Sequence, residues 1–342
     1  MPLTMTTLSH RPSGKRATMS DVARLAGVSV KTVSRVVNAE AGVQPATAER
    51  VSEAIARLGF SRNLGARDLR RGVGTGMVGL VVEDVGNPFY SLLTRAVEEV
   101  ARARGRRVLT GSSDEDPAGE RELVREFCAR RVDGLLVVPA GREHGYLRAE
   151  IDAGTPVVFV DRPAGDLDAD TVLLDDAGGT EQAVHHLVGR GHRRIGFLGD
   201  DPAIHTAAER LRGYRSGLHR AGIAADPVLT AMGPHTAESV RAALTGPLRP
   251  ATAVITGNNR ITVHLLRVLA GAQRRPALVG FDDFELADLV DPPVTVITHD
   301  TRELGRTAAE LLFSRLDGDT APARHLVIPT RLLPRRSGEV SP

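Results

Sequence analysis

The sequence has almost no cysteine, since Cys128 is the only one in 342 residues. This excludes an intramolecular disulfide framework and is typical of a protein that works in a reducing cytoplasm. Long apolar runs are also missing. None approaches the ~20 residues that span a bilayer, and the N-terminal MPLTMTTLSHRPSGKR has no apolar secretory segment. We therefore expect a cytoplasmic chain with no membrane partner.

Motifs for catalysis, metals and cofactors are missing as well. The sequence contains no HExxH, no Cys/His cluster, no GxSxG elbow and no P-loop. His185, His186 and His192 lie on a predicted helix and in its following turn, where we expect a structural role. The glycines of GTGMVG (74–79) match the dinucleotide fingerprint GxGxxG, but they precede a strand-like run instead of following one. The sequence thus predicts no enzyme, no cofactor and no metal.

Positive charge is concentrated near the N-terminus. Residues 1–71 contain 12 Lys and Arg against 5 Asp and Glu, whereas the remainder contains 32 against 37. The overall charge of +2 therefore hides a basic head and a mildly acidic body. A basic head indicates a polyanionic partner, for which nucleic acid is the natural candidate.

The stretch VSVKTVSRVVN (28–38) predicts a short helix with a polar stripe and a valine stripe. Ser29 stands at the N-cap position. A solvated surface face is one interpretation, but these side chains also suit DNA phosphates and base edges. The polar stripe consists of Lys31, Ser34, Arg35 and Asn38.

The neighbouring segments favour DNA binding. Thr18 and Asp21 resemble a capping box that opens a first helix, and Gly27 permits a tight turn before the second. Pro45 and Gly59 suit the two ends of a third helix. This order is typical of a helix-turn-helix domain, whose second helix enters the major groove. A small core is predicted from Val22, Ala26, Val28, Val33, Val37, Val51, Ile55 and Leu58.

At this point the sequence resembles the LacI/GalR family of bacterial transcription regulators. The resemblance is carried by SDVARLAGVSVKTVSRVVN (20–38), NLGARDL (63–69) and TGMVGLVVEDVGNPFY (75–90), with weaker similarity almost to the C-terminus. It implies base contacts by Val30, Lys31 and Arg35, with packing the alternative for Val30 and a phosphate contact the alternative for Arg35. Phosphate contacts are implied for Ser29, Thr32, Ser34 and Asn38.

Residues 63–69 read by themselves as a flexible basic linker, because the segment is short and contains Gly65. The resemblance implies instead a hinge helix that orders on specific DNA and pairs with its dimer mate in the minor groove. Asn63 would start this helix, Ala66 would allow the close approach of the pair, and Leu69 would enter the central base step.

From residue 76 onward, strand-like runs alternate with helical stretches, which predicts parallel sheets covered by helices. The seven strand-like runs are 78–82, 108–111, 134–138, 156–160, 194–199, 253–256 and 277–280, and the six helical stretches are 88–104, 119–131, 178–190, 207–221, 258–270 and 301–316. About 265 residues suit two such sheets better than one. The resemblance implies an N-terminal all-α helix-turn-helix head followed by an α/β periplasmic-binding-protein-like body of two doubly wound lobes. We therefore expect a disordered extension (1–17), a DNA-binding domain (18–62), a hinge and linker (63–75) and a two-lobed effector-binding and dimerisation domain (76–342).

Polar residues follow several predicted strands of the body, where ligands bind in such sheets. Each could be an ordinary turn or cap residue, but their recurrence at the same kind of edge favours a shared cleft. The resemblance implies effector binding by Phe89, Tyr90, Asp161, Arg162, Arg210, Asn258 and Asp282. This mixture of charged, amide and aromatic groups suits a hydroxyl-rich sugar. Asn259 stands where the family usually has an acid.

Together these features predict a dimeric transcription regulator, a repressor, that binds a pseudo-palindromic duplex and is switched by a small carbohydrate effector. A solute-binding protein or an α/β enzyme with the same body is the alternative. The absence of a signal segment and the basic head count against the first, and the absence of a catalytic constellation counts against the second. No leucine heptads follow Leu333, which favours a dimer over a tetramer.

Overall fold

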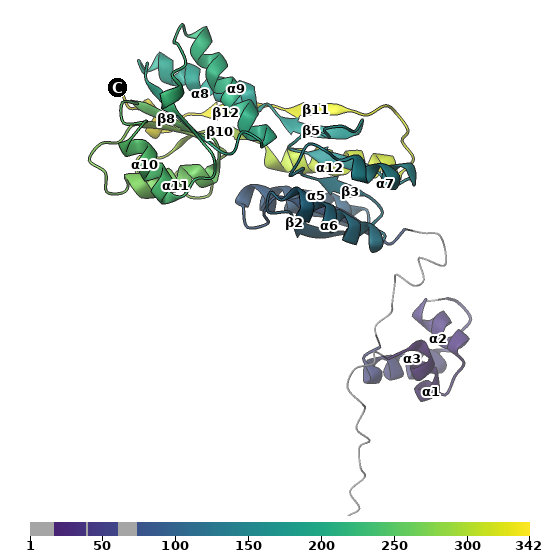
Figure 1. The fold of residues 1–342 in the computed structure, drawn as a ribbon. Coiled ribbons are helices and arrows are strands. Elements are labelled where there is room, and N and C mark those ends of the chain that lie inside the picture. Colours follow the sequence, from purple (N-terminus) through teal and green to yellow (C-terminus); the bar gives the residue numbers. More distant parts are fainter. Residues whose placement is uncertain (1–16, 39, 61–73) are drawn as a thin grey trace, which may run out of the picture. The chain divides into compact units, whose positions relative to one another are not determined.

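The computed structural model describes residues 17–38, 40–60 and 74–342, which form two compact units divided before Gly76 (Figure 1). The first unit is all-α and the second contains two α/β lobes, so the predicted fold class is confirmed. Among the described residues, no helix is long and apolar enough to cross a bilayer. The implied hinge residues Asn63, Ala66 and Leu69 lie outside the described ranges.

The head consists of α1 (Met19–Ala26), α2 (Val30–Val37) and α3 (Pro45–Leu58). Thr18 and Asp21 form the expected capping box, and Gly27 ends α1 in a left-handed conformation. The first two helices are thus joined by a turn of three residues, as a helix-turn-helix requires. The fully buried core is built on Val22, Val33 and Val51, with Val28, Val37, Ile55 and Leu58 partly buried around it.

The first lobe of the body, lobe A, has a six-stranded sheet in the order β11-β5-β4-β3-β1-β2. All of its pairings are parallel. Its strands are β1 (Met77–Val82), β2 (Arg107–Ser112), β3 (Leu135–Val137), β4 (Val157–Val160), β5 (Asp170–Leu174) and β11 (His325–Ile328). Its helices are α5 (Pro88–Ala103), α6 (Pro117–Ala129), the short α7 (Arg148–Asp152) with the 3-10 turn Gly145–Leu147, and α12 (Thr301–Leu316).

The second lobe, lobe B, repeats this arrangement with the strand order β12-β10-β9-β8-β6-β7. Only the β10–β12 pairing is antiparallel. Its strands are β6 (Ile195–Gly199), β7 (Thr230–Met232), β8 (Ala253–Thr256), β9 (Ala277–Phe281), β10 (Thr295–His299) and β12 (Thr330–Leu333). Its helices are α8 (Asp176–Gly189), α9 (His205–Arg220), α10 (Ala237–Thr245) and α11 (Asn259–Leu269), with 3-10 turns at Pro227–Leu229 and Ser337–Glu339.

The central strands are apolar throughout because each sheet is buried on both faces. Side chains alternate between the faces with period two. In β4, for example, Val158 and Val160 pack in the core with α5 and α12, whereas Val157 and Phe159 pack in the core with α6. Lobe B likewise has one core against α8 and α9 and another against α10 and α11.

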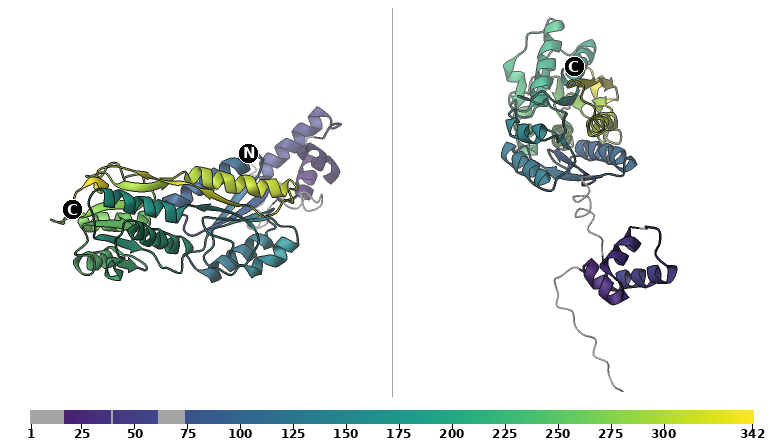
Figure 2. Two further views of the ribbon diagram at one scale, coloured as in Figure 1. Left: turned by 90° about the horizontal axis from the view of Figure 1, so that it is seen from above. Right: turned by 90° about the vertical axis from the view of Figure 1, so that its right-hand side faces the viewer.

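The chain crosses between the lobes three times, after β5, after β10 and between β11 and β12. Figures 1 and 2 show the last of these segments in yellow, running from one lobe to the other. Neither lobe is therefore a continuous stretch of sequence.

The seven strand-like runs and six helical stretches that the sequence indicates between residues 78 and 316 all form, within two residues at either end. The sequence analysis did not predict five strands of the body, β5, β7, β10, β11 and β12, or the helices α7 and α10.

Candidate functional site

The second helix of the head begins at a well-formed cap. The Ser29 hydroxyl accepts a hydrogen bond from the Thr32 amide at 3.1 Å and lies 2.9 Å from the Thr32 hydroxyl. Val30 is 45% exposed, so it does not belong to the core of the head. Lys31 is exposed beside it. The start of α2 therefore presents both an apolar and a basic side chain to the surroundings.

The end of the same helix is held by contacts to the loop that follows. Arg35 Nη2 donates to the carbonyl oxygen of Ala41 at 3.1 Å, and Arg35 Nε lies 3.9 Å from a carboxylate oxygen of Glu40. The Asn38 amide nitrogen donates to Glu40 Oε1 at 3.1 Å and to the Ser34 hydroxyl at 3.3 Å. The polar stripe predicted from the sequence is thus present, and part of it is bonded within the head.

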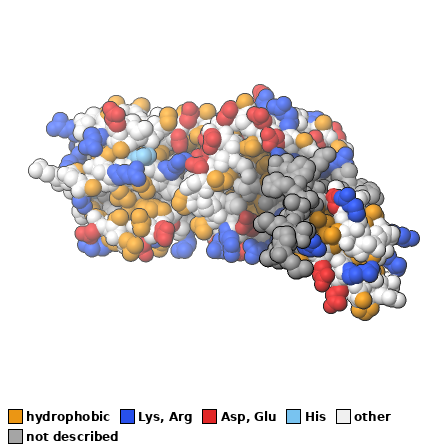
Figure 3. All heavy atoms as spheres, turned by 90° about the horizontal axis from the view of Figure 1, so that it is seen from below, with side chains coloured by type: hydrophobic (Ala, Val, Ile, Leu, Met, Phe, Trp, Pro, Cys, Tyr) orange, Lys and Arg blue, Asp and Glu red, His pale blue; other side chains and the backbone are white. Residues whose placement is uncertain are grey.

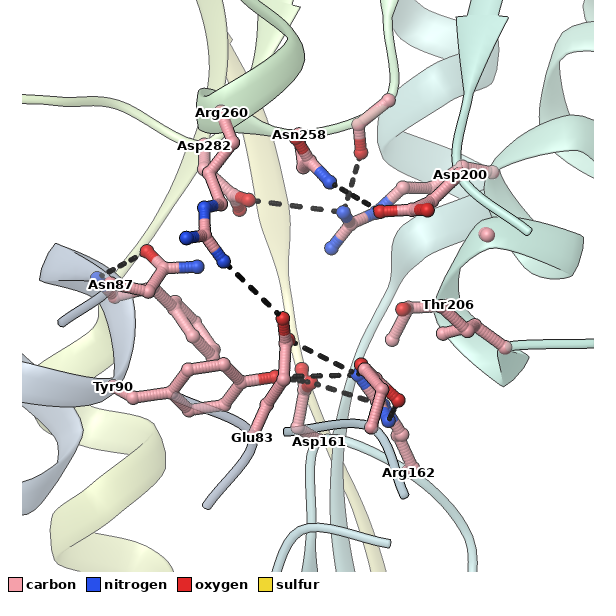
Figure 4. Close-up of a pocket in the computed structure, with 16 residues that line it drawn as sticks. Glu83, Asn87, Tyr90, Asp161, Arg162, Asp200, Thr206, Asn258, Arg260 and Asp282 are labelled. Carbon is pink, nitrogen blue, oxygen red and sulfur yellow. Dashed lines mark hydrogen bonds and ion pairs between the residues drawn. The ribbon is translucent and has the colours of Figure 1, made fainter. Parts of the chain in front are cut away.

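In the body, all seven residues expected at the cleft line one cavity between the lobes (Figure 4). Its volume is about 40 Å³, roughly the space of one water molecule, whose share of liquid volume is about 30 Å³. The residues that meet there are Phe89, Tyr90, Asp161, Arg162, Arg210, Asn258 and Asp282. They come from the ends of strands, from the starts of α5 and α11, and, for Arg210, from the second turn of α9.

Two aspartates occupy equivalent places in the two lobes. Asp161 follows β4 with φ 68° and Asp282 follows β9 with φ 66°, and β4 and β9 hold the same position in their sheets. Left-handed backbone is uncommon for residues other than glycine, although aspartate tolerates it better than most. Both carboxyl groups are buried and line the cavity. Strained backbone of this kind is concentrated at functional sites.

Arg210 holds the lobe B side of the cavity together. Its Nε donates to Asp176 Oδ1 at 2.6 Å, its Nη1 donates to the Gly257 carbonyl at 2.6 Å, and the guanidinium stacks 3.9 Å from the ring centre of Phe281. Asp282 Oδ2 lies 3.8 Å from Nη1. The helices α8 and α9 can bring Asp176 and Arg210 together because Gly213 has no side chain. A Cβ there would lie 2.2 Å from the Ala177 carbonyl oxygen.

The two carboxyl groups beside Arg210 differ in proton affinity. Burial raises the pKa of Asp176 to about 7, although Arg210 opposes the shift. Burial acts on Asp282 in the same direction, but Arg210 and a hydrogen bond from His299 at 2.9 Å outweigh it, so the pKa of Asp282 is lowered. Asp282 is thus ionised at neutral pH, whereas Asp176 is poised to exchange a proton.

Arg162 organises the lobe A side. Its Nη1 donates to Glu115 Oε2 and to the Pro139 carbonyl, both at 2.7 Å, and its Nη2 lies 3.4 Å from Glu83 Oε2. Burial raises the pKa of Glu83 to about 7, and Glu115 adds to the shift while Arg162 opposes it. The Tyr90 hydroxyl lies 3.4 Å from Asp161 and 3.5 Å from Arg162 Nη2, which links all of these groups into one network.

Direct contacts also join the two lobes at the cavity. Asn259 at the start of α11 donates to the Asn87 side chain at the N-cap of α5, at 3.0 Å. Arg260 lies 3.1 Å from Asp84 and 3.8 Å from Glu83. Asn259 stands where the sequence resemblance leads one to expect an acid, and an amide can donate here where a carboxylate could not.

Several polar atoms of this region are buried and have no hydrogen-bond partner within the described part of the chain. They are Asp161 Oδ1, Arg162 Nε and Asn259 Oδ1. Buried polar groups are nearly always satisfied, and exceptions indicate strain or an unfilled binding function. Asp161 and Arg162 line the cavity, so their spare acceptor and donor lie where a ligand would bind.

The sequence did not single out four charged residues that line the cavity, Glu83, Glu115, Asp200 and Arg260. Glu83 follows β1 directly and Asp200 follows β6 directly, so the strand-end rule that found Asp161 and Asp282 applies to them as well. Glu115 lies in a loop and Arg260 on a helix, and no local pattern marks either.

Two of the three histidines of HHLVGRGH, His186 and His192, have structural contacts, as expected. His186 Nε2 lies 3.2 Å from the Gly338 carbonyl oxygen, and His192 Nε2 lies 2.8 Å from that of Val340. They attach the C-terminal segment to lobe B. No group of three His, Cys, Asp or Glu side chains in the described ranges is placed to hold a metal ion. Gly76 directly precedes β1 and Gly79 lies inside it, whereas the glycines of a dinucleotide-binding loop would follow the strand.

Comparison with known proteins identifies both parts of the chain. Residues 18–63 match the model of bacterial regulatory proteins of the lacI family, and residues 184–338 match a periplasmic binding protein-like domain. The transcriptional regulator CelR of Thermobifida fusca is 35% identical over 340 residues, covering 95% of this chain and 99% of CelR. The ribose operon repressor of Escherichia coli K12 is 33% identical, covering 94% and 99%.

Solved structures give the same result. A complex of CelR with cellobiose has a TM-score of 0.70 at 33% identity, covering 94% of this chain and all of that one. The lac repressor dimer, bound to its operator and an anti-inducer, has a TM-score of 0.79 at 26% identity, covering 95% and 100%. These relatives and structural neighbours are transcription regulators and not enzymes.

Proposed function

Because this chain belongs to the lacI family of bacterial regulatory proteins, we propose that it is a dimeric repressor whose operator affinity is switched by a carbohydrate in the cleft. DNA binding and regulation by an effector follow from the family. The repressor role, the carbohydrate, the dimer, the cytoplasmic location and the individual contacts are our proposals.

In the head, we assign base reading to Val30, Lys31 and Arg35. Val30 and Lys31 are exposed at the start of α2, the part of a recognition helix that contacts base edges. Arg35 has to exchange its contacts with Ala41 and Glu40 for a guanine, which a bidentate guanidinium recognises well. Ser29, Thr32, Ser34 and Asn38 are assigned to phosphates. Since the Ser29 hydroxyl already caps α2, its phosphate contact would use its hydrogen atom.

In the body, the effector site is supported above all by the buried polar atoms without partners at the cavity wall. Asp161 Oδ1 needs a donor and Arg162 Nε needs an acceptor, and a sugar hydroxyl is both. The cavity of about 40 Å³ is far smaller than a sugar. Effector entry therefore requires the lobes to separate or the arginines to move. This requirement couples binding to the arrangement of the lobes, with a coupling energy of ~1–3 kcal/mol expected for allosteric pairs.

We assign the dimer contact to exposed apolar side chains of the body. Leu289 is 75% exposed and Leu286 57% exposed in lobe B, and Val85 is 51% and Leu92 44% exposed in lobe A. Figure 3 shows a face of lobe B on which several hydrophobic side chains reach the surface. Contiguous apolar patches mark interaction surfaces, whereas single exposed apolar residues are ordinary, so we place the centre of the contact at Leu286 and Leu289, which are three residues apart in one segment. Leu289→Asp should lower the dimer fraction in sedimentation equilibrium, and an unchanged fraction would remove Leu289 from the interface.

The hinge assignment remains a proposal from the sequence, with Asn63 at its start, Ala66 at the approach of the paired helices and Leu69 at the central base step. We expect Leu69→Ala to lose most specific affinity while keeping salt-sensitive nonspecific binding, because the latter depends on phosphate contacts. DNA bending and affinity should be measured on the same duplex. Equal bending and equal affinity for variant and wild type would show that the segment only connects the head to the body.

The function as a whole is tested by selecting duplexes from a random library with the full-length protein. We expect a pseudo-palindromic consensus, strongly salt-dependent affinity, and release by one member of a carbohydrate panel. Arg35→Ala should relax one position in each half-site, because a good Arg–guanine contact contributes ~1–3 kcal/mol of discrimination. Arg24→Ala, an exposed arginine on α1, is the control for lost charge. The same consensus and affinity for both variants would end the assignment of Arg35 to base reading.

A further inference from the structure

The cavity contains more acidic than basic side chains. Five carboxyl groups and three guanidinium groups line it. Two of the acids come from lobe A loops, one follows β4, and two follow strands of lobe B. They are Glu83, Glu115, Asp161, Asp200 and Asp282. This imbalance matters because the interaction of a ligand with ions in a buried site is weakly screened.

Each guanidinium group of the cavity already has carboxylate partners. Arg162 is bonded to Glu115 and lies near Glu83, as described above. Arg210 is bonded to Asp176, and Asp282 lies within 3.8 Å of it. Among the described residues, Arg162 Nε has no hydrogen-bond partner, but Asp161 Oδ2 lies 3.9 Å from it and would repel a ligand carboxylate or phosphate that accepted from this nitrogen. At the guanidinium nitrogens that are already bonded, such a group would have to displace an internal carboxylate and leave it buried without a partner. Leaving a buried charge unpaired is strongly unfavourable.

Arg260, the third guanidinium group, is also matched. It lies 3.1 Å from Asp84 and 3.8 Å from Glu83, and it is the most exposed of the three. Drawing it to an anionic ligand would break its contacts between the lobes. Figure 4 shows Arg260 directed from lobe B toward the carboxylate of Glu83.

The hydrogen-bonding capacity left over at the acids favours donors on the ligand. Asp161 is 3% exposed, and among residues 17–38, 40–60 and 74–342 its Oδ1 has no hydrogen-bond partner. Its other oxygen has weak contacts with the Tyr90 hydroxyl at 3.4 Å and with Arg162 Nε at 3.9 Å. A hydroxyl or an ammonium group can donate to this atom, whereas a carboxylate cannot and would be repelled.

We propose that the cleft accepts uncharged and amine-bearing carbohydrates and rejects sugar acids and sugar phosphates. This inference rests on the proposed carbohydrate effector and adds the charge class to it. The proton affinities agree with it: burial, with a contribution from neighbouring acids, raises the pKa values of Glu83 and Asp176 to about 7 and also raises that of Asp161. A further negative charge would add to this repulsion, and an ammonium group would relieve it.

The test is calorimetry with the full-length protein on sugars that share a skeleton and differ in charge. Suitable sets are glucose, glucosamine, glucuronate and glucose 6-phosphate, and ribose with ribose 5-phosphate. Cellobiose with cellobiuronate extends the panel to disaccharides. We expect each acid or phosphate to bind at least tenfold more weakly than its uncharged counterpart. An acid or phosphate that binds as tightly as that counterpart overturns this inference but leaves the carbohydrate function standing. If no sugar binds, both fail.

A pair of variants tests the physical cause. Glu83→Gln combined with Glu115→Gln removes the two carboxylates that occupy Arg162 while keeping side chains of the same shape. We expect this double variant to bind the sugar acid of the best set at least tenfold more tightly than the wild type does. The control is Glu122→Gln with Glu126→Gln, two exposed acids on α6 outside the cavity. An unchanged acid-to-neutral ratio in a folded Glu83/Glu115 variant overturns the inference, and an equal gain in the control does so as well.

Discussion

Replacing Arg210 by Met should strongly destabilise the body, because this side chain neutralises two buried carboxyl groups at once. The variant keeps most of the apolar contact with Phe281 but leaves Asp176 and Asp282 without their guanidinium partner. Breaking a buried ion pair from one side costs about 3–5 kcal/mol. We therefore expect the free energy of unfolding of the body to fall by about that amount at pH 8.

The same loss should be smaller in mild acid. Asp176 has a pKa of about 7 while Arg210 still opposes the effect of burial, so its pKa lies higher in Arg210→Met. At pH 6 Asp176 is mostly protonated in both proteins, so Arg210 has little charge to pair with there, whereas at pH 8 the ionised Asp176 of the wild type is stabilised by Arg210. The penalty relative to the wild type consequently decreases as the pH falls. Adding Asp176→Asn should recover part of the stability at pH 8 for the same reason.

The assay is urea unfolding followed by far-ultraviolet circular dichroism at pH 6 and pH 8. Arg212→Met is the matched control, since Arg212 lies on the same helix, is exposed and pairs only with Glu209 among the described residues. Exposed pairs contribute ~0–1 kcal/mol. If Arg210→Met costs no more than Arg212→Met, or if its penalty grows as the pH falls, the role assigned to Arg210 is wrong.

Three further outcomes are expected. Ser29→Ala should destabilise the head by about 1 kcal/mol, because an N-cap bond is lost. An unchanged melting temperature for the unfolding of the head would contradict this. Arg260→Ala should barely alter thermal stability but should speed hydrogen exchange around Asp84, and unchanged exchange would show that this ion pair does not restrain the lobes. Glu83 has a raised pKa of about 7, so the wild type should lose stability relative to Glu83→Gln as the pH rises from 5 to 8. Parallel urea titrations of both proteins would show no divergence if Glu83 titrates normally.

The parts of the fold that the sequence predicts are those with strong local signals. Buried strands such as β1 and β4 are continuous apolar runs, and the helices of the head have caps at Thr18 and Ser29. The strands β7 and β12 are not predicted because they are short and lie at the edges of the lobe B sheet, where the burial that makes an apolar run necessary is absent. Edge strands carry mixed polarity, so periodicity alone does not mark them.

The residues of the cleft can likewise be divided into those that the sequence predicts and those that it does not. Asp161 and Asp282 are predictable because parallel strands end at one edge of a sheet, and Glu83 obeys the same rule. The partners of these acids are not predictable by that route. Arg260 faces lobe A only because of how the lobes pack, and Asp176 reaches Arg210 only through the close approach of α8 and α9 at Gly213. Sequence spacing contains no information on such contacts between distant segments.

The three crossings between the lobes have a consequence for biosynthesis. A ribosome releases the chain from the N-terminus, and domains generally fold as units when their residues have emerged. Here α12 and β11 complete lobe A, β12 completes the sheet of lobe B, and all three arrive after residue 300. His186 and His192 then fasten the final residues. The head emerges first, so its three helices are complete while both lobes still lack an edge strand. A nascent chain would therefore have its DNA-binding helices before the cleft between the lobes was complete. A chain truncated after α11 would never complete that cleft.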